Sequence, residues 1–266
     1  MPAGPTDLAA KRDSMAKDLF RSAARKRQTL FNAWLMMNNP LAIELIGDAG
    51  WDCVTIDQQH GAGGNETMLS CLTAAKAAGL PAIVRVANND PGLVGRALDA
   101  GAQGVMCPLI ENVAEAESFV QAVKYPPRGN RSWGPYRAKI GATGDYFKTA
   151  NRFTIACPQI ETKGALADLD AILSLEGVDM VCFGPNDLSV ALTGSIDIWA
   201  KEVLEAGKEV LAKAREKGVM TLTFCNDVEF AKPRMKEGWD VVAVGTDTGW
   251  LSAAAAATRA AFDSKS

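Results

Sequence analysis

The feature that most constrains this chain is the regular alternation of short apolar runs with longer amphipathic stretches. The apolar runs are rich in β-branched residues and have the length of strands, whereas the longer stretches carry apolar residues at helical spacing. Eight runs are predicted as strands, at residues 30–35, 53–56, 82–86, 104–107, 154–160, 180–183, 219–224 and 241–244. Strands that alternate with helices form parallel sheets, so the pattern predicts an α/β fold with a parallel sheet.

Eight such units favour closure of the sheet into one barrel. The predicted helices occupy residues 40–48, 66–78, 91–100, 113–123, 166–174, 201–217, 227–236 and 250–262. Four of them end at a glycine just before the next strand (Gly79, Gly101, Gly218 and Gly238), as helices that stop in the left-handed conformation do. Because helices would cover the sheet all round, we predict a (β/α)₈ TIM barrel. A doubly wound open sheet is the alternative.

The chain length agrees with a single catalytic domain. The chain has 266 residues, and one barrel of this type takes roughly 250. An amphipathic stretch at residues 7–27 precedes the first strand, so we predict an N-terminal helical extension over residues 1–28 and the barrel over residues 29–266. The longest interruption of the pattern, residues 125–152, is rich in proline, glycine, arginine and aromatic residues. Long insertions in compact domains are usually functional or disordered.

The composition excludes several classes of protein. The chain has 28 basic and 31 acidic residues, and its net charge of −3 provides no field that would attract nucleic acid or an anionic membrane. No apolar run approaches the ~20 residues that cross a bilayer, and the charges scattered through residues 1–27 do not fit a secretory signal. A cytoplasmic location is therefore predicted. The cysteines form no C-x-x-C pair and are interpreted as buried, reduced thiols: Cys53, Cys71, Cys107, Cys157, Cys182 and Cys225.

Polar residues follow the predicted strands at one end of the barrel. In this fold the active site lies at the carboxyl ends of the strands. Trp34 lies at the end of the first strand, Gln159 at the end of the fifth, and Gly184, Pro185 and Asn186 follow the sixth. We predict that these five residues contact the substrate.

Two carboxylates at the ends of successive strands, Glu161 and Asp187, indicate a metal site. Carboxylate and water oxygens are the ligands that hard cations such as Mg²⁺ or Mn²⁺ prefer. Co²⁺ is a further candidate, and zinc is less favoured because clustered thiolates and histidines are missing. The competing interpretation is a pair of solvated loop carboxylates.

Acid–base and charge-stabilising roles are predicted for His60, Asp57 and Arg85, which lie at the ends of the second and third strands. His60 is the only histidine, and an imidazole moves protons readily near neutral pH, with Asp57 placed to orient it. Arg85 ends an apolar strand, where a charge is costly unless it meets an anion, and its planar fork suits a keto acid or an enolate oxygen. The alternatives are a structural histidine and an ion pair between Arg85 and a carboxylate at the barrel rim.

Other chemistries receive weaker support. The glycine-rich residues 61–64 could contact a phosphate through main-chain N–H groups, but the lysine of a P-loop is missing. No lysine ends a predicted strand, and Lys163 lies too close to the next helix for a Schiff base. A Schiff-base lysine is therefore not expected.

Taken together, these motifs make the chain similar to the HpcH/HpaI family of class II pyruvate aldolases over residues 30–262. The family includes 4-hydroxy-2-oxoheptanedioate aldolase and 2-keto-3-deoxy sugar-acid aldolases. The matching segments are Trp34-Leu35, Val54-Thr55-Ile56-Asp57 with His60, Ile83-Val84-Arg85, Asn89-Asp90-Pro91, Leu98-Asp99-Ala100-Gly101, Tyr125-Pro126-Pro127-Arg128-Gly129 with Arg131, Gln159-Ile160-Glu161-Thr162, Glu176-Gly177-Val178-Asp179, Gly184-Pro185-Asn186-Asp187-Leu188-Ser189 and Val244-Gly245-Thr246-Asp247.

The resemblance implies roles for individual residues. The metal ligands would be Glu161 and Asp187, and the catalytic histidine and arginine would be His60 and Arg85. Asp99 would act with the histidine of a neighbouring subunit, which implies a homo-oligomer, a hexamer arranged as a trimer of dimers. Main-chain N–H groups around Asn186 would bind the carboxylate of the keto acid.

The activity implied by the resemblance is the formation or cleavage of 4-hydroxy-2-keto acids. A metal would stabilise the enolate of pyruvate or of a related 2-keto acid such as hydroxypyruvate, and an aldehyde would be the acceptor. Residues 125–152 and the helix that carries Asp99 are expected to shape the aldehyde pocket. Two alternatives stay open: a related barrel lyase that acts on acyl-CoA or PEP-like acids, and a non-catalytic oligomeric barrel. One departure from the family pattern is Gln59, where a glutamate usually precedes the histidine.

Overall fold

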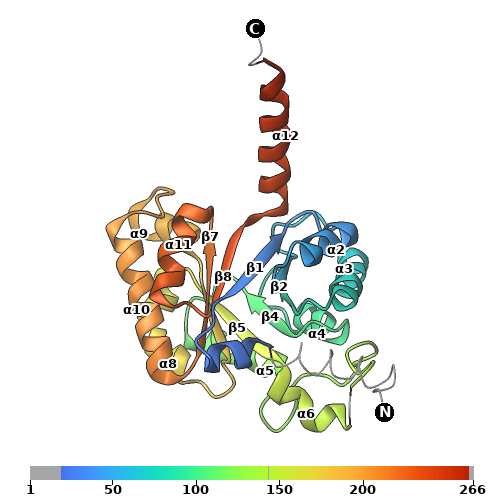
Figure 1. Ribbon diagram of the computed structural model, residues 1–266. Helices are drawn as coiled ribbons and strands as arrows, with labels where there is room; N and C mark the ends of the chain where they lie inside the picture. The colour runs from blue at the N-terminus through green and yellow to red at the C-terminus, as the bar shows by residue number, and fades with distance from the viewer. Residues whose placement is uncertain (1–18, 143, 264–266) are drawn as a thin grey trace.

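The computed structural model describes residues 19–142 and 144–263, and its centre is a closed barrel of eight parallel strands (Figure 1). The strands are β1 (Leu30–Leu35), β2 (Cys53–Asp57), β3 (Ala82–Arg85), β4 (Gly104–Cys107), β5 (Ile155–Ile160), β6 (Met180–Phe183), β7 (Met220–Cys225) and β8 (Val241–Thr246). Each strand pairs with the next along the chain, and β8 pairs with β1 to close the barrel. The predicted (β/α)₈ TIM barrel is confirmed, and the strand ends agree with the prediction to within two residues.

Helices surround the barrel in the order that the sequence pattern predicts, with three differences. The helices are α2 (Pro40–Asp48), α3 (Asn65–Ala78), α4 (Pro91–Asp99), α5 (Val113–Val123), α6 (Tyr146–Phe153), α7 (Lys163–Ala167), α8 (Leu169–Ser174), α9 (Pro185–Thr193), α10 (Lys201–Lys217), α11 (Val228–Glu237) and α12 (Asp247–Asp263). The segment predicted as one helix after β5 is divided at Asp168 into α7 and α8. Helices α6 and α9 lie where no helix was predicted. Proline in its first turn and Gly194 in the left-handed conformation (φ 77°) bound α9.

Two apolar layers stabilise the fold. Alternate strand residues such as Ile83, Met106 and Leu222 fill the barrel interior, and their neighbours pack against the surrounding helices. The six cysteines are buried in these layers, which confirms their interpretation as buried thiols. Burial raises the pKa of the Cys53 thiol to about 12, and a thiol that stays protonated is a poor nucleophile and metal ligand.

The N-terminal segment closes the end of the barrel at which the strands begin. Residues 19–25 are helical, and Phe20 is buried against the first residues of the strands. Arg21 on the same helix forms an ion pair of 2.5 Å with Asp179, which lies just before β6. The rest of the predicted extension, residues 1–18, lies outside the described residues.

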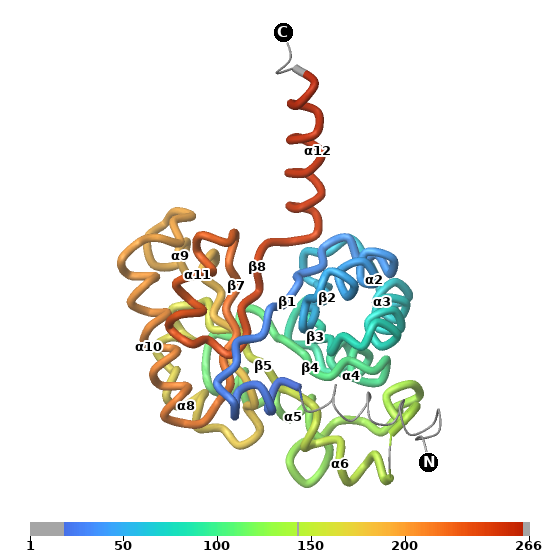
Figure 2. Tube along the Cα trace, viewed as in Figure 1, coloured from blue at the N-terminus to red at the C-terminus, as the bar shows by residue number. Residues whose placement is uncertain are grey.

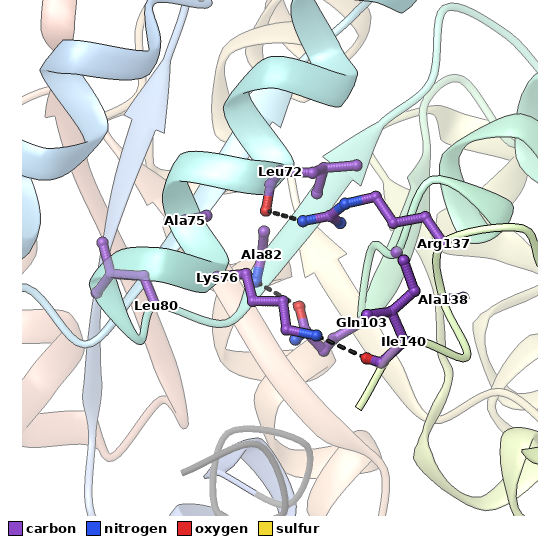
Figure 3. A pocket seen from close by; sticks show the side chains of 10 residues that line it. Leu72, Ala75, Lys76, Leu80, Ala82, Gln103, Arg137, Ala138 and Ile140 are labelled. Carbon is purple, nitrogen blue, oxygen red and sulfur yellow. Dashed lines mark hydrogen bonds between the residues drawn. The ribbon is translucent and has the colours of Figure 1, made fainter. Parts of the chain in front are cut away.

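The insertion at residues 125–152 lies at this same end of the barrel. It joins α5 to β5 and therefore passes the end at which β5 begins. Arg137 of the insertion donates to the carbonyl oxygens of Leu72 (3.0 Å) and Ala100 (2.6 Å), and Lys76 donates to the insertion main chain (2.7 Å). These contacts surround a cavity of about 30 Å³, enough for an ordered water (Figure 3). The expectation that the insertion shapes the substrate pocket is therefore wrong for the pocket of its own chain.

The C-terminal helix α12 points away from the barrel instead of packing on it (Figures 1 and 2). Its first residue, Asp247, is buried and accepts a hydrogen bond from the N–H of Met36 (2.8 Å), and Trp250 stacks on Trp51 with ring centroids 4.9 Å apart. Every residue from 251 to 262 is exposed. No helix in the described ranges combines the length and the apolar character that crossing a membrane requires.

Candidate active site

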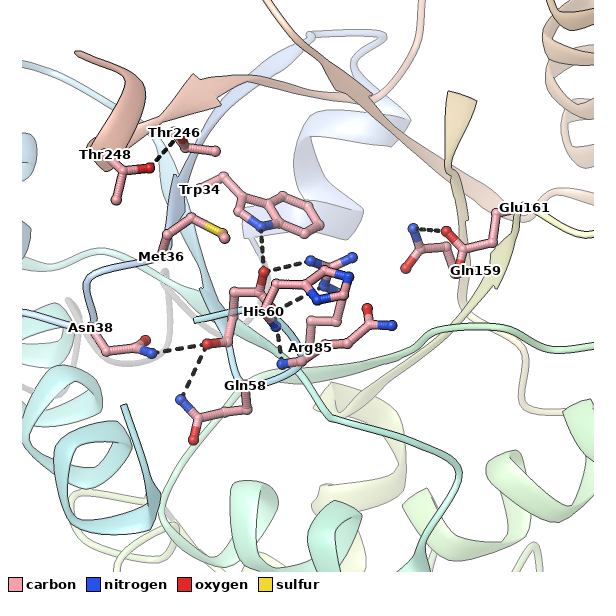
Figure 4. A network of polar contacts seen from close by, with 12 residues as sticks. Trp34, Met36, Asn38, Gln58, His60, Arg85, Gln159, Glu161, Thr246 and Thr248 are labelled. Carbon is pink, nitrogen blue, oxygen red and sulfur yellow. Dashed lines mark hydrogen bonds and ion pairs between the residues drawn. The ribbon is translucent and has the colours of Figure 1, made fainter. Parts of the chain in front are cut away.

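A cavity of about 190 Å³ opens at the carboxyl ends of the strands. Its walls are formed by Trp34, Met36, His60, Arg85, Gln159, Gly184, Pro185, Asn186, Asp187, Phe224 and Thr246. These residues come from the ends of β1, β3, β5, β7 and β8 and from the segments that follow β1, β2 and β6. The structure thus brings the five predicted substrate-contacting residues together in one cavity, and Figure 4 shows Trp34 and Gln159 among them.

A buried ion pair between Arg85 and Asp57 lies beside this cavity. Parallel pairing of β2 and β3 places the two residues opposite each other, at the last position of each strand. Arg85 donates from Nε to Asp57 Oδ1 (3.0 Å) and from Nη2 to Oδ2 (2.5 Å), and Trp34 Nε1 donates to the same Oδ2 (3.2 Å). The guanidinium also lies 4.8 Å from the centre of the Trp34 ring, at cation–π distance. Nη1 of Arg85 forms no hydrogen bond with the described residues, so it is available to a ligand in the cavity.

Asp57 orders the main chain around His60 and does not contact the imidazole. Its Oδ1 accepts hydrogen bonds from the N–H groups of Gln59 (2.9 Å) and His60 (3.3 Å). Burial by itself raises the pKa of this carboxyl, but the hydrogen bonds and charge of Arg85, together with the hydrogen bonds from Gln59 and Trp34, outweigh burial and hold the pKa below its usual value. Asp57 was expected to orient the imidazole directly. In the structure it acts on the ring only indirectly, through hydrogen bonds to the main chain of Gln59 and His60.

Glu161 is buried, and each of its carboxylate oxygens accepts a hydrogen bond. Oε1 accepts from the main-chain N–H of Leu109 (2.8 Å), and Oε2 accepts from Gln159 Nε2 (2.5 Å). Leu109 has a φ of 53°, a left-handed conformation that non-glycine residues rarely adopt. A Cβ atom at Gly184 would lie 2.5 Å from Glu161 Oε2, so only glycine lets the chain after β6 pass so close to the carboxylate. Three segments thus converge on one carboxylate and define its position.

Glu161 and Asp187 together fit a divalent cation. Burial, with the nearby charge of Asp187 acting in the same direction, raises the pKa of Glu161 to about 7, although the Leu109 N–H opposes the shift. Neither carboxylate forms an ion pair within the described ranges, and the buried Oε1 of Gln159 lacks a hydrogen-bond partner. No three His, Cys, Asp or Glu side chains of the described chain converge on a metal position. A hard cation here would take two carboxylate ligands and complete its shell with water and substrate oxygens.

His60 and Asp99 lie at opposite ends of the chain's own barrel. His60 is exposed and lines the cavity. Asp99 is the last residue of α4, which begins next to the cavity end of the barrel at Pro91 and runs toward the other end, where Asp99 pairs with Arg131 (2.7 Å). The pairing of Asp99 with a histidine that the resemblance implies therefore requires a second subunit.

The sequence interpretation missed two apolar residues of the cavity wall, Met36 and Phe224. Phe224 packs edge-on against Trp34, with ring centroids 5.2 Å apart. The alternation of side chains along β7 could have identified it, because Met220 and Leu222 also face the barrel interior. Met36 lies in the irregular segment that follows β1. In such a segment the sequence has no regular spacing from which the direction of a side chain could be predicted.

Comparison with known proteins identifies the family of the chain. The model of the HpcH/HpaI aldolase/citrate lyase family matches residues 30–254. The chain belongs to this family. The chain is similar to a hydroxypyruvate/pyruvate aldolase from Rhizorhabdus wittichii, which is 35% identical over 224 residues that cover 84% of this chain and 89% of the relative. A 4-hydroxy-2-oxo-heptane-1,7-dioate aldolase from Escherichia coli is 33% identical over 246 residues, covering 91% of this chain and 94% of the relative.

The HpcH/HpaI fold is also shared with a solved structure. A family protein from Burkholderia cenocepacia superposes with a TM-score of 0.86 at 31% identity, over 93% of this chain and 100% of the other. Nearly the whole barrel is therefore common to this HpcH/HpaI protein and its solved relative. Membership of the HpcH/HpaI family confirms the resemblance that the sequence motifs carried.

Proposed function

We propose that the chain is a class II aldolase that makes or cleaves 4-hydroxy-2-keto acids, with pyruvate or a related 2-keto acid such as hydroxypyruvate as the nucleophile and an aldehyde as the acceptor. The observation that carries the proposal is the buried Glu161 beside Asp187, which lines the same cavity as Arg85 and His60. Relatives named as hydroxypyruvate/pyruvate and 4-hydroxy-2-oxo-heptane-1,7-dioate aldolases support it.

In this proposal Glu161 and Asp187 hold a divalent cation, Mg²⁺ or Mn²⁺, with Co²⁺ as a further candidate. Such a cation, when bound, supplies the Lewis-acid chemistry that favours loss of a proton from C3 of a 2-keto acid. Gly184, Pro185 and Asn186 bring the N-terminus of α9 to the cavity, and its unpaired N–H groups suit the substrate carboxylate.

Arg85 and His60 perform separate tasks. Nη1 of Arg85 donates to the C2 oxygen as negative charge develops there, while Asp57 keeps the guanidinium in place through Nε and Nη2. His60 exchanges a proton with the hydroxyl oxygen at C4 when the carbon–carbon bond forms or breaks. Trp34 and Gln159 complete the wall, Trp34 by packing on Arg85 and Gln159 by holding Glu161.

Chelation by EDTA tests the proposal. Release of pyruvate from a 4-hydroxy-2-keto acid should stop when EDTA is added and return when Mg²⁺ or Mn²⁺ is supplied in excess. Activity that survives complete removal of divalent metal would contradict the proposal. Tight binding of CoA or another nucleotide would favour the acyl-CoA lyase instead.

We also propose that the enzyme is a homo-oligomer, a hexamer arranged as a trimer of dimers. Two features of the chain support this. The outer face of α12 is exposed from residue 251 to residue 262 and contains Leu251 (60% exposed) and Phe262 (77% exposed) among alanines. Asp99 lies where it could reach a second subunit and not its own cavity. Light scattering that gives the mass of a monomer at working concentration would contradict the proposal.

A further inference from the structure

Asn38 is a buried residue in an unusual backbone conformation, in the segment that follows β1. Its side chain is 1% exposed, and its φ of 51° is in the left-handed region, which asparagine tolerates better than most residues. Its Nδ2 donates to the main-chain carbonyl of Asp57 (2.9 Å), as Figure 4 shows. That carbonyl is the point at which β2 ends and the segment with His60 begins.

The segment that follows β2 is folded tightly around this side chain. A Cβ atom at Gly61 would lie 2.6 Å from Asn38 Nδ2, and one at Gly63 would lie 2.6 Å from the Asn38 Cβ. Ala62, between these two glycines, donates its N–H to the carbonyl of Met36 (2.8 Å). The two glycines therefore permit the close approach of the Asn38 side chain, and Gly61 also permits that of the Asp57 carbonyl.

His60 depends on this segment for its position. Its N–H is bonded to the Asp57 carboxylate (3.3 Å), but its imidazole is exposed and forms no hydrogen bond with any residue of the described ranges. Within the described residues, the hydrogen bond that holds His60 is therefore that of its backbone. We propose that Asn38 is a positioning residue for His60: its amide fastens the segment at residues 57–63 so that the imidazole faces the cavity. The consequence for catalysis rests on the proposed aldolase function.

Two variants remove the amide donor without disturbing the left-handed backbone. Asn38→Asp keeps the shape of the side chain, and Asn38→Gly keeps the conformation and removes the side chain. The matched control is Asn39→Ala. Asn39 is the neighbouring residue and caps α2 by accepting from Leu41 N–H (2.9 Å), with no bond to the segment that carries His60. All three variants should melt somewhat below the wild type, so melting temperature shows that each one folds.

The first readout is independent of activity. His60 is the only histidine, so protein labelled with ¹³C at histidine Cε1 gives a single imidazole resonance. We expect this resonance to shift and broaden in Asn38→Asp and Asn38→Gly and to stay at its wild-type position in Asn39→Ala. An unchanged resonance in both folded Asn38 variants would overturn the proposal, whether or not the protein is an aldolase.

The second readout is kinetic. In the aldolase assay kcat should fall about tenfold to a hundredfold in the Asn38 variants, since a displacement of about 1 Å can cost that much, while the KM for the keto acid stays nearly constant. In a His60→Ala background Asn38→Asp should have no further effect on kcat, because the residue acts through the ring. A full additional loss in that background would refute the positioning role. A wild type without metal-dependent turnover would instead contradict the proposed function and leave the resonance test decisive for Asn38.

Discussion

Replacement of Asp57 by asparagine tests the most tightly coupled part of the site. The Asp57 side chain is fully buried and that of Arg85 is 9% exposed, so Asp57→Asn leaves the guanidinium without its counterion in a place that water hardly reaches. The substitution also turns an acceptor of five hydrogen bonds into a group with a single acceptor oxygen.

The expected loss of unfolding free energy is about 3–5 kcal/mol at neutral pH, the usual cost of removing one partner from a buried ion pair. The loss should depend on pH in a defined direction. Because Arg85 holds the pKa of Asp57 below its usual value, the stability that Asp57 contributes is fully present above the unfolded pKa, near 4, and is lost as pH falls through the folded pKa. The wild type should therefore approach the variant in stability below about pH 4.

Urea denaturation monitored by tryptophan fluorescence measures this loss, with a second variant as control. Arg85→Leu combined with Asp57→Asn removes both charges, so its loss should be smaller than the sum of the two single losses. Additive losses, or a loss below about 1 kcal/mol in Asp57→Asn at neutral pH, would refute the reasoning that the pair is buried and coupled.

Three further outcomes are expected. Glu161→Gln should abolish Mn²⁺ binding in calorimetry and metal-dependent turnover while circular dichroism stays unchanged, and wild-type Mn²⁺ affinity would remove Glu161 from the metal site. Arg85→Ala should slow exchange of the C3 protons of pyruvate by about 10²–10³-fold, and undiminished exchange would refute the role of Arg85 as enolate stabiliser. In His60→Ala, the same exchange persists if water is the base, and it fails together with turnover if His60 is the base. A chain that ends at Gly249 should form an assembly of fewer subunits than the full chain if α12 joins subunits, and an unchanged number of subunits in light scattering would exclude α12 from the interface.

The position of Glu161 shows how the barrel builds a site from distant segments. Its carboxylate meets the N–H of Leu109 after β4 and Gln159 at the end of β5, and it closely approaches Gly184 after β6. Parallel pairing of β4 with β5 and of β5 with β6 brings these segments to one end of the barrel. The left-handed conformation of Leu109 directs the N–H toward the carboxylate and is consistent with strain retained at a functional site.

The barrel and most of its mouth could be predicted from local pattern alone. The spacing of apolar residues identifies the strands and helices along the chain, and eight successive strand–helix units can close in few ways. Because parallel strands all end on one side, the sequence alone assigns Glu161, Asp187, Arg85 and His60 to one rim.

Tertiary structure decided the features that depend on contacts between segments. The partner of the Asp57 carboxylate is Arg85 and not the imidazole, because the β2–β3 register places the two residues side by side. The insertion at residues 125–152 lies away from the mouth, because it precedes a strand and does not follow one. Neither the projection of α12 nor the burial of Asn38 against the segment with His60 can be read from a periodic pattern in the sequence. Each depends on how separate segments are placed in space.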